Sequence, residues 1–573
     1  MANDKLRKVA LGLEPASLVL KNARIVNVFN GEIEDGDIAI EDGIIAGIGD
    51  YDGIRETDLC YRYVAPGFID GHVHIESSML VPAEFAKIVM PWGTTTVIAD
   101  PHEIANVCGL DGVKFMINSA KTVPLEVLIM MPSCVPTTTF ETAGAVITSE
   151  EIMALKNEPD ILGLGEMMNY PGVIDGDADV YRKLQAMADR PIDGHAPGVS
   201  GKKLTAYRLA GIVTDHESTT PAELEEKVRL GMYVHLREGS ATRNVKTLLP
   251  CVTKDNCSRL LFCTDDKHPE DIRSEGHISF NINLALDHGM TPVDAIRMAT
   301  LNIANCYNLR HHGAIAPGYL ADLVVFDNLR RIDPVSVYKR GVLVAKDKEP
   351  LFNAPKLNDR KVLSTIMFHP DDIDLRLPLK SGKVYCIGLD RDNVTTKKLV
   401  EQVNVKNGYY VQDNSLDILK LAVIERHHYS GRVGIALVKG YGLQGGAIAL
   451  SIAHDSHNLI VIGDSDDDML MAAKTVKGIN GGIVLVKNHQ VFDYLRLEVA
   501  GLMTSQDYRH VEMKLARLKK EIRAMGVDSQ VDDPFLSLAF LSLSVIPDLK
   551  CTDYGLFDVN SFSLIPMEVS EDD

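Results

Sequence analysis

Two histidines, His72 and His74, follow the apolar run Val64-Ala-Pro-Gly-Phe-Ile-Asp-Gly, which predicts a buried β-strand. Residues i and i+2 of a strand point to the same face, so both imidazoles can reach one metal ion while Val73 points the other way. Two histidines can also share a solvated strand face without any ligand. Eleven of the 18 histidines lie between residues 67 and 312, and this concentration favours the metal site.

Four more candidate ligands, Glu166, His195, His216 and Asp265, stand at the ends of predicted strands. Taken singly they also fit structural roles, namely a salt-bridge partner, a turn residue, a core histidine and a helix N-cap, in that order. All six residues follow one another along a single series of strands. Their coincidence favours a common metal-binding site over six separate structural roles.

The segment that must position these residues alternates short apolar runs with longer helical stretches from residue 66 to 312. The repeated order of strand then helix is typical of a (β/α)8 TIM-like barrel. In such a barrel the chemistry lies at the carboxyl ends of the strands. The sequence therefore predicts an α/β fold in which the six candidate ligands meet at one face.

The flanks of this segment predict a small β-sandwich domain formed from residues 1–65 and 313–350. Asn30-Gly31 and Asp42-Gly43 separate short apolar runs, and such pairs are strong hairpin signals. After a linker at residues 350–362, we expect a C-terminal α/β domain over residues 363–573. It includes a helix near 506–525 that ends at Gly526.

The amino-acid composition argues against some classes of binding partner. The 573 residues include 59 Lys and Arg against 79 Asp and Glu, for a formal net charge of −20. Proteins that bind nucleic acids or anionic membranes need a basic excess, so we expect neither partner. The longest nearly apolar stretch, 535–546, is too short to span a bilayer. Nine irregularly spaced cysteines and the lack of a signal-like start favour a cytoplasmic protein with reduced thiols.

Longer strings carry a resemblance to known proteins. Pro66-Gly-Phe-Ile-Asp-Gly-His-Val-His, the later histidines and Asp265 resemble the amidohydrolase superfamily. The strings His72-Val-His-Ile-Glu-Ser-Ser-Met, Asp193-Gly-His-Ala-Pro-Gly and His454-Asp-Ser-His-Asn resemble, within it, the bacterial adenine deaminase family. The resemblance extends over essentially the whole chain.

This resemblance implies hydrolysis of adenine to hypoxanthine and ammonia, a purine-salvage reaction, at a centre of two divalent ions, with manganese or iron as the expected metals. Related dihydroorotases and hydantoinases usually bridge their metals with a carboxylated lysine, whereas this chain offers Glu166 at the fourth strand. That difference disfavours the alternative of a cyclic-amide hydrolase. The implied ligands are His72, His74 and Asp265 for one ion, His195 and His216 for the other, and Glu166 between the two.

The implied mechanism assigns roles to further residues. A metal-bound hydroxide attacks C6 of adenine, and Asp265 takes its proton and passes it to the departing amine. A second acid must act on N1, and Glu103 and Glu238 are the candidates, with His102 and His235 behind them. An equally open alternative is that these four residues only orient metal ligands. The candidates for contact with the purine edge are Ser77, Ser78, Arg237 and Ser240.

Two alternatives belong to other classes of protein. A catalytically silent scaffold on the same barrel would be marked by missing ligands, and none of the six is missing. The zinc deaminase design needs Pro-Cys-x-x-Cys, and the string at Pro250-Cys251 lacks the second cysteine. We therefore expect an enzyme with a small-molecule substrate that assembles as a homo-oligomer.

Three C-terminal strings have uncertain meaning in sequence alone. Gly440-Tyr-Gly-Leu-Gln-Gly fits a dinucleotide-binding pattern, although so short a pattern recurs by chance. The acidic string at Asp464 favours a helix start over a metal site. The string His454-Asp-Ser-His457-Asn is either a segment that folds against the barrel mouth or a solvated loop.

Overall fold

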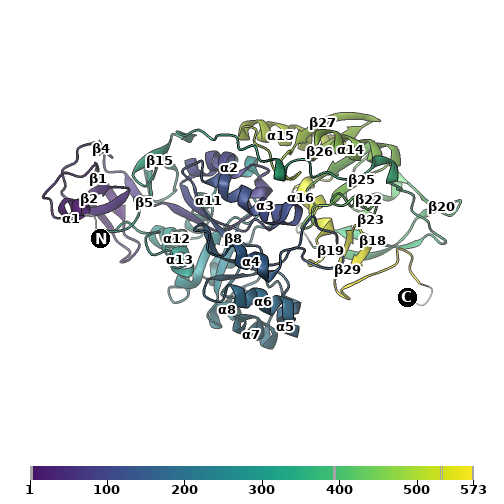
Figure 1. The fold of residues 1–573 in the computed structure, drawn as a ribbon, viewed down its shortest axis with the longest axis horizontal. Coiled ribbons are helices and arrows are strands. Elements are labelled where there is room, and N and C mark those ends of the chain that lie inside the picture. The colour runs from purple at the N-terminus through teal and green to yellow at the C-terminus, as the bar shows by residue number, and fades with distance from the viewer. Residues whose placement is uncertain (1–3, 391–394, 530, 532, 571–573) are drawn as a thin grey trace.

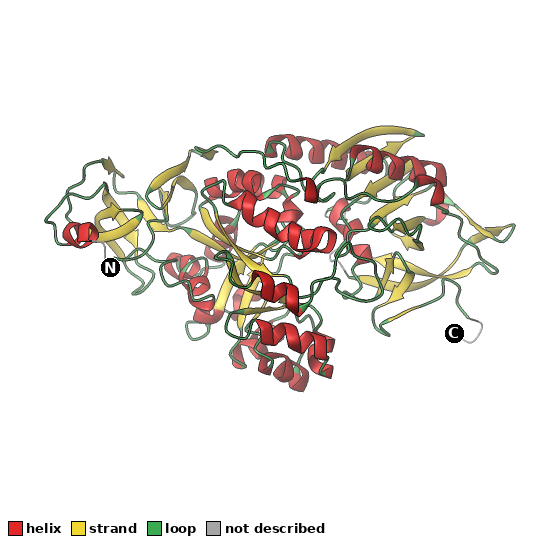
Figure 2. Ribbon diagram, viewed as in Figure 1, coloured by secondary structure: helices red, strands yellow, loops and turns green. Residues whose placement is uncertain are grey.

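The computed structural model describes residues 4–390, 395–529, 531 and 533–570. The molecule is elongated, with a β-sheet that includes β1 and β2 at one end and a second sheet that includes β18 and β22 at the other (Figure 1). A helix-covered parallel sheet lies between them, as the colouring of helices and strands in Figure 2 makes plain.

The N-terminal sheet joins the two flanks of the central segment. Its hydrogen-bonded order is β17-β16-β15-β14-β5-β1-β2-β3, with β4 paired to β1. Strand β5 pairs antiparallel with β14, so residues on either side of the central segment share one sheet. Helix α1 (Asp4–Ala10) packs against β2 and β3. The strands are β1 Leu18–Val26, β2 Ile33–Glu41, β3 Ile44–Gly49, β4 Glu56–Asp58, β5 Tyr63–Pro66, β14 Leu323–Phe326, β15 Pro334–Lys339, β16 Val342–Lys346 and β17 Glu349–Pro350.

The predicted hairpin at Asp42-Gly43 is confirmed. These two residues connect β2 to β3 and have φ angles of 50° and 76°. Both angles fall in the left-handed region that Asp tolerates and Gly favours, so the turn matches the strand twist. The run at Asn30-Gly31 likewise lies between the paired strands β1 and β2.

The central sheet is parallel and strongly curled. Strands β6 to β10 form one set in the order β10-β9-β8-β7-β6, and β11 to β13 form a second. The two sets approach at both edges: Val213 N–H donates to Ile192 O at 3.0 Å, and Val73 forms a parallel bridge with Asp265. The strands are β6 Phe68–Val73, β7 Thr94–Ala99, β8 Glu126–Met131, β9 Ile161–Met167, β10 Ile192–Gly194, β11 Thr214–Asp215, β12 Tyr233–Arg237 and β13 Leu260–Cys263.

Helices cover the outer face of this curled sheet (Figure 2). Every residue of β6 and β7 is buried, as expected for parallel strands that are covered on both sides. Capping boxes at Thr148 and Thr220 start two of the helices. The helices are α2 Pro82–Val89, α3 His102–Ala120, α4 Ser149–Leu155, α5 Tyr170–Asp175, α6 Ala178–Ala186, α7 Gly201–Leu209, α8 Pro221–Arg229, α9 Val245–Leu248, α10 Pro269–Glu275, α11 Ile278–Asp287, α12 Pro292–Met298 and α13 Leu301–Cys306.

The C-terminal region is built on a mixed sheet of order β19-β18-β23-β22-β25-β24-β26-β27, accompanied by α14 Asp466–Ile479, α15 Tyr508–Ala524 and α16 Pro534–Ala539. The helix predicted near 506–525 is confirmed as α15. The strands of the main sheet are β18 Lys383–Leu389, β19 Thr396–Gln402, β22 Ile418–Ile424, β23 Val433–Lys439, β24 Gly446–Leu450, β25 Leu459–Gly463, β26 Gly482–Lys487 and β27 Gln490–Arg496. Two small sheets contain β20 Asn404–Lys406 with β21 Tyr409–Val411, and β28 Leu549–Thr552 with β29 Gly555–Asp558 and β30 Ser563–Leu564.

The structure also decides two of the C-terminal strings. The acidic string starts a helix, because the Ser465 side chain accepts a hydrogen bond from Asp468 N–H at the N-terminus of α14. The glycines from Gly440 to Gly445 lead from β23 into strand β24. A dinucleotide-binding turn leads into a helix instead, so this string is a connection between strands.

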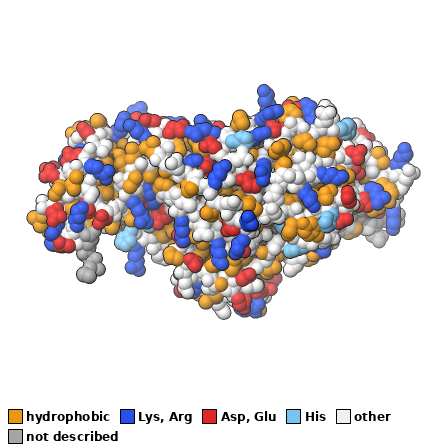
Figure 3. Space-filling view, turned by 45° about the horizontal axis from the view of Figure 1, so that its top comes forward, with side chains coloured by type: hydrophobic (Ala, Val, Ile, Leu, Met, Phe, Trp, Pro, Cys, Tyr) orange, Lys and Arg blue, Asp and Glu red, His pale blue; other side chains and the backbone are white. Residues whose placement is uncertain are grey.

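The surface carries acidic and basic side chains interspersed over the face drawn in Figure 3. All nine cysteines are free thiols. Within the described ranges, no helix is both long and apolar enough to cross a membrane.

Candidate metal centre

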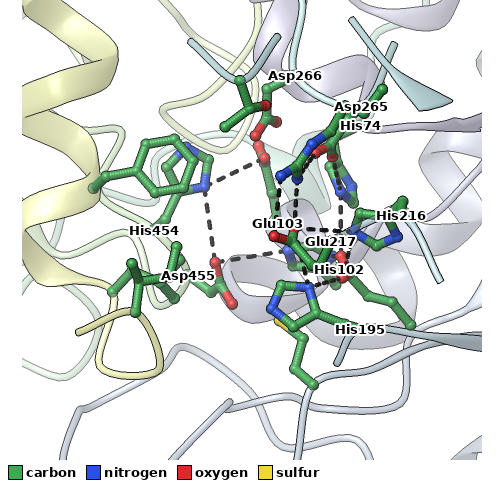
Figure 4. A pocket seen from close by; sticks show the side chains of 17 residues that line it. His74, His102, Glu103, His195, His216, Glu217, Asp265, Asp266, His454 and Asp455 are labelled. Atoms are coloured by element: carbon green, nitrogen blue, oxygen red, sulfur yellow. Dashed lines mark hydrogen bonds and ion pairs between the residues drawn. The ribbon is translucent and has the colours of Figure 1, made fainter. Parts of the chain in front are cut away.

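The carboxyl ends of the central strands meet around one cavity (Figure 4). The lining residues are His74, His102, Glu103, Glu166, Met168, His195, His216, Glu217, Arg237, Thr242, Asp265, Asp266, His454, Asp455, Phe540, Leu543 and Ile546.

One group of candidate ligands comes from the ends of β6 and β13. His72 lies in β6 and His74 just beyond it, and their Nε2 atoms approach to 3.1 Å. Asp265 follows β13, and its N–H donates to His72 O at 3.0 Å, while His74 N–H donates to Asp265 O at 3.2 Å. These backbone bonds hold Asp265 Oδ1 at 3.1 Å from His74 Nε2 and 3.6 Å from His72 Nε2.

The second group comes from β9 and from the ends of β10 and β11. His195 Nδ1 lies 2.7 Å from Glu166 Oε2, and His216 Nε2 lies 3.3 Å from the same oxygen. The other oxygen, Oε1, lies 3.2 Å from His74 Nε2. Glu166 therefore reaches both groups of histidines, one with each carboxylate oxygen.

The donor sets fit divalent metal ions. Overlapping sets of three have their ligand atoms within 4.8 Å of one another, among them His72, His74 and Glu166, and Glu166, His195 and His216. The buried His195 Nε2 has no hydrogen-bond partner among the described residues. Such imidazole and carboxylate sets accept manganese, iron, zinc and cobalt alike.

Both carboxylates in this centre are held in the charged form. Burial raises the pKa of Glu166, but His195 and His216 outweigh burial and hold that pKa well below its usual value. Burial likewise raises the pKa of Asp265, and Arg237 with His74 reverses the shift to well below the usual value. Anionic oxygens are the form in which these groups bind a cation.

Arg237 contacts two carboxylates at the cavity wall. Its Nη1 donates to Asp265 and its Nη2 donates to Glu217 Oε2 at 3.0 Å. Glu217 also lies 3.4 Å from His216 Nε2. The sequence predicted Arg237 as a contact to the purine edge and no role for Glu217, although the place of Glu217 directly after a strand-end histidine was a signal.

Glu103 lines the cavity from the first turn of α3. Burial raises its pKa, and the nearby carboxylates of Glu76 and Asp266 add to the effect, so the pKa lies well above its usual value. The Ser77 hydroxyl lies 3.1 Å from Glu103 Oε1 and also contacts Asp266. His102, the neighbouring candidate, places Nδ1 at 3.6 Å from Glu166 Oε1.

Glu238 and Ser240 are not among the described side chains that line the cavity. Glu238 Oε2 accepts a hydrogen bond from Val245 N–H at 3.3 Å. Ser240 donates to Asp271 and accepts from His268 N–H. Both residues hold the loop after β12, so the structure does not bring them to the candidate ligands.

Two other candidates, His235 and Ser78, also lie outside the described cavity lining. His235 lies two residues before Arg237 on β12, which places it about 6–7 Å farther from the carboxyl end of the strand. Its Nε2 lies 3.4 Å from the Tyr307 hydroxyl inside the curled sheet. Ser78 donates to Ile75 O within its own turn.

The C-terminal region completes the cavity. His454 Nδ1 lies 3.5 Å from Glu103 Oε1, and Asp455 Oδ1 lies 3.7 Å from His102 Nε2. Of the two interpretations of this string, the structure selects the one in which it folds against the mouth of the curled sheet. The apolar lining residues Phe540, Leu543 and Ile546 come from the same region, and nothing in their local sequence indicated this role.

Known proteins match the chain along nearly its whole length. Residues 63–384 match the model of the Amidohydrolase family, and residues 393–563 match the Adenine deaminase C-terminal domain. "Adenine deaminase 2" of Carboxydothermus hydrogenoformans is 48% identical over 565 residues, which is 98% of this chain and 99% of that protein. "Adenine deaminase" of Clostridium acetobutylicum is 46% identical over 567 residues, with 98% and 99% covered.

Solved structures also match part of the chain. The atrazine chlorohydrolase of Arthrobacter aurescens, crystallised with zinc, covers 58% of this chain and 96% of its own at 13% identity, with a TM-score of 0.45. The relatives above share far more sequence, and they match both the central segment and the C-terminal region. The chain therefore belongs to the adenine deaminase family of the amidohydrolases.

Proposed function

We propose that this chain hydrolyses adenine to hypoxanthine and ammonia. Relatives at 46–48% identity over nearly the full length bear the name adenine deaminase. The observation that carries the proposal is the position of Glu166, whose two oxygens face different groups of buried histidines. A glutamate in this position also separates the chain from the lysine-bridged cyclic-amide hydrolases.

The proposed centre holds two divalent ions, manganese or iron, on His72, His74, Glu166, His195, His216 and Asp265. Bound there, such ions lower the pKa of a water molecule, so that a nucleophile forms at neutral pH. The overlapping donor sets support two ions, because Glu166 belongs to both groups.

Asp265 and Glu103 carry the proton transfers in this proposal. Asp265 is charged and faces the histidines, so it can take a proton from the attacking water and pass it to the departing amine. Glu103, whose pKa is raised, can donate a hydrogen bond to N1 and draw electrons from C6. Arg237 keeps Asp265 charged and in place. One water enters, and ammonia and hypoxanthine leave, so the atoms balance.

We extend the proposal to the architecture. The curled parallel sheet would be the (β/α)8 barrel of residues 66–312, flanked by the composite β domain of 1–65 and 313–350 and followed by the C-terminal domain of 363–573. The approach of the two strand sets at both edges supports barrel closure. A homo-oligomer in the cytoplasm remains our proposal, and the free thiols support the reducing compartment.

Ammonia release from adenine tests the proposal. Protein loaded with manganese is mixed with adenine, and ammonia is measured alongside loss of the adenine absorbance band; dihydroorotate and hydantoin serve as comparison substrates. We expect equal amounts of hypoxanthine and ammonia from adenine and no turnover of the cyclic amides. Turnover of a cyclic amide without turnover of adenine would overturn the proposal.

A further inference from the structure

The cavity has two chemically different sides (Figure 4). The candidate metal ligands lie on one side, and His454 and Asp455 lie on the other. Phe540 stacks on the His454 ring, with centroids 4.4 Å apart and planes inclined by 21°. The side opposite the metal centre is therefore an aromatic surface with two polar groups at its edge.

The segment that carries these groups is fixed in place. Backbone His454 N–H donates to Ala539 O at 3.1 Å, and the Ser542 hydroxyl donates to His454 O at 2.9 Å. Ser456 donates to Glu141 Oε2 at 2.7 Å, which attaches the segment to the loop after β8. A segment held from both directions is pre-organised to bind a ligand with little loss of entropy.

The polar atoms on this side have spare hydrogen-bonding capacity. Thr137 donates to Asp455 Oδ2 at 2.7 Å, while Oδ1 lies 3.7 Å from His102 Nε2 and 3.8 Å from His454 Nδ1, both beyond hydrogen-bond distance. His454 is only 3% exposed, and its Nε2 has no hydrogen-bond partner in the described part of the chain. A buried polar atom without a partner can form a hydrogen bond with a ligand or with an ordered water molecule.

A third metal ion is a poor candidate for that ligand. Glu103, His454 and His457 place ligand atoms within 4.8 Å of one another. However, Ala453 N–H donates to His457 Nδ1 at 3.2 Å, so the neutral ring carries its hydrogen on Nε2. Neither nitrogen of His457 then has a lone pair for a metal, and the site favours an organic ligand with N–H and acceptor groups.

We propose that Asp455, His454 and Phe540 form the subsite that binds the five-membered ring of the substrate purine. Asp455 Oδ1 accepts the hydrogen bond of the ring N–H, His454 contacts the adjoining polar edge, and Phe540 contacts the ring face. The inference rests on the proposed function, since it places the amino edge of adenine at the metal centre. It assigns base recognition to the C-terminal region and bond cleavage to the central sheet.

Paired ligands test the subsite. The KM of adenine and the inhibition constant of 9-methyladenine, which has no N–H on the five-membered ring, are measured for the parent and for Asp455→Asn. We expect the variant to raise the KM of adenine about tenfold or more, since the hydrogen bond to a charged acceptor is lost. The inhibition constant of 9-methyladenine should change by less than about threefold, because that ligand never makes the bond.

Ser456→Ala is the matched control. It removes a neighbouring hydroxyl that anchors the same segment without lining the cavity, so it loosens the segment but keeps the carboxylate. We expect it to affect the two ligands equally. Equal weakening of both ligands by Asp455→Asn, or no weakening of either, overturns the subsite. Absence of adenine turnover in the parent overturns the proposed function itself, so the two failures are distinguishable.

Discussion

The two sides of the cavity differ in how they are built. On the side of the central sheet, ionisable groups satisfy one another: each oxygen of Glu166 faces an imidazole, and Asp265 faces both a histidine and Arg237. On the C-terminal side, apolar side chains predominate, and His454 Nε2 has no partner within the described residues. The contrast fits our proposals that one side holds ions and transfers protons, whereas the other binds a ring of the substrate.

Asp265→Asn tests the side of the cavity formed by the central sheet, and we expect this variant to have the largest effect. The variant removes the group that we propose takes and returns the proton, so kcat for adenine should fall about 10²–10⁴-fold. Steady-state kinetics with a parallel measurement of bound metal would check this. Asp266→Asn, on a neighbouring cavity residue, is the control and should cost much less. If kcat is unchanged in Asp265→Asn, Asp265 does not transfer the proton.

Arg237→Gln tests the charge balance on the same side. The change leaves Asp265 and Glu217 buried without their shared cation, and breaking a buried pair in this way costs about 3–5 kcal/mol of unfolding free energy. Urea unfolding of the metal-free protein would measure the loss. The double variant Arg237→Gln/Glu217→Gln should recover part of it. Additive losses would contradict the pairing.

Glu126→Gln tests a buried carboxylate that lies outside the cavity, for comparison with the variants on its two sides. This carboxylate accepts hydrogen bonds from Lys339 and the His312 ring; burial raises its pKa, but these two partners outweigh burial and hold the pKa well below its usual value. A lowered carboxyl pKa stabilises the fold above about pH 4.5, and this stabilisation is lost as the pH falls further. We expect a loss of about 1–3 kcal/mol at pH 7 that shrinks towards pH 3, with kcat unchanged.

Circular dichroism across that pH range would follow the stability of parent and variant. A stability difference that is independent of pH would mean that Glu126 acts through packing alone. A fall in kcat without a loss of bound metal would mean that the contact between β8 and β15 affects the geometry of the cavity.

Phe540→Leu tests the C-terminal side of the cavity, and we expect this variant to have the smallest effect. Replacing the aromatic ring keeps an apolar surface but removes ring stacking, which is worth about 0.5–1.5 kcal/mol. We expect KM for adenine to rise about two- to tenfold while kcat changes little. Phe557→Leu, at a buried ring in β29 that is absent from the cavity lining, is the control. A fall in kcat with unchanged KM would reverse the roles of the two sides.

The same contrast explains what could be predicted from sequence. Candidate ligands such as His72, Glu166 and Asp265 stand at the ends of strands in a repeated unit. The local sequence pattern therefore indicates where each side chain lies and which way it points. Phe540 lines the same cavity as Glu103 only through tertiary packing between segments more than 400 residues apart, and no local pattern specifies that arrangement. Glu238 shows the opposite case: it stands beside a strand end, yet the turn after β12 places its Oε2 at Val245 N–H, away from the cavity lining.

Anomalous diffraction from crystals grown with manganese and hypoxanthine tests the central claim most directly. The account predicts two manganese peaks, one beside His72, His74 and Asp265 and one beside His195 and His216, with Glu166 between them. It also predicts a purine ring whose five-membered ring faces Asp455. Manganese bound elsewhere, or a purine with its five-membered ring turned towards Glu166, would contradict the division between the two sides of the cavity.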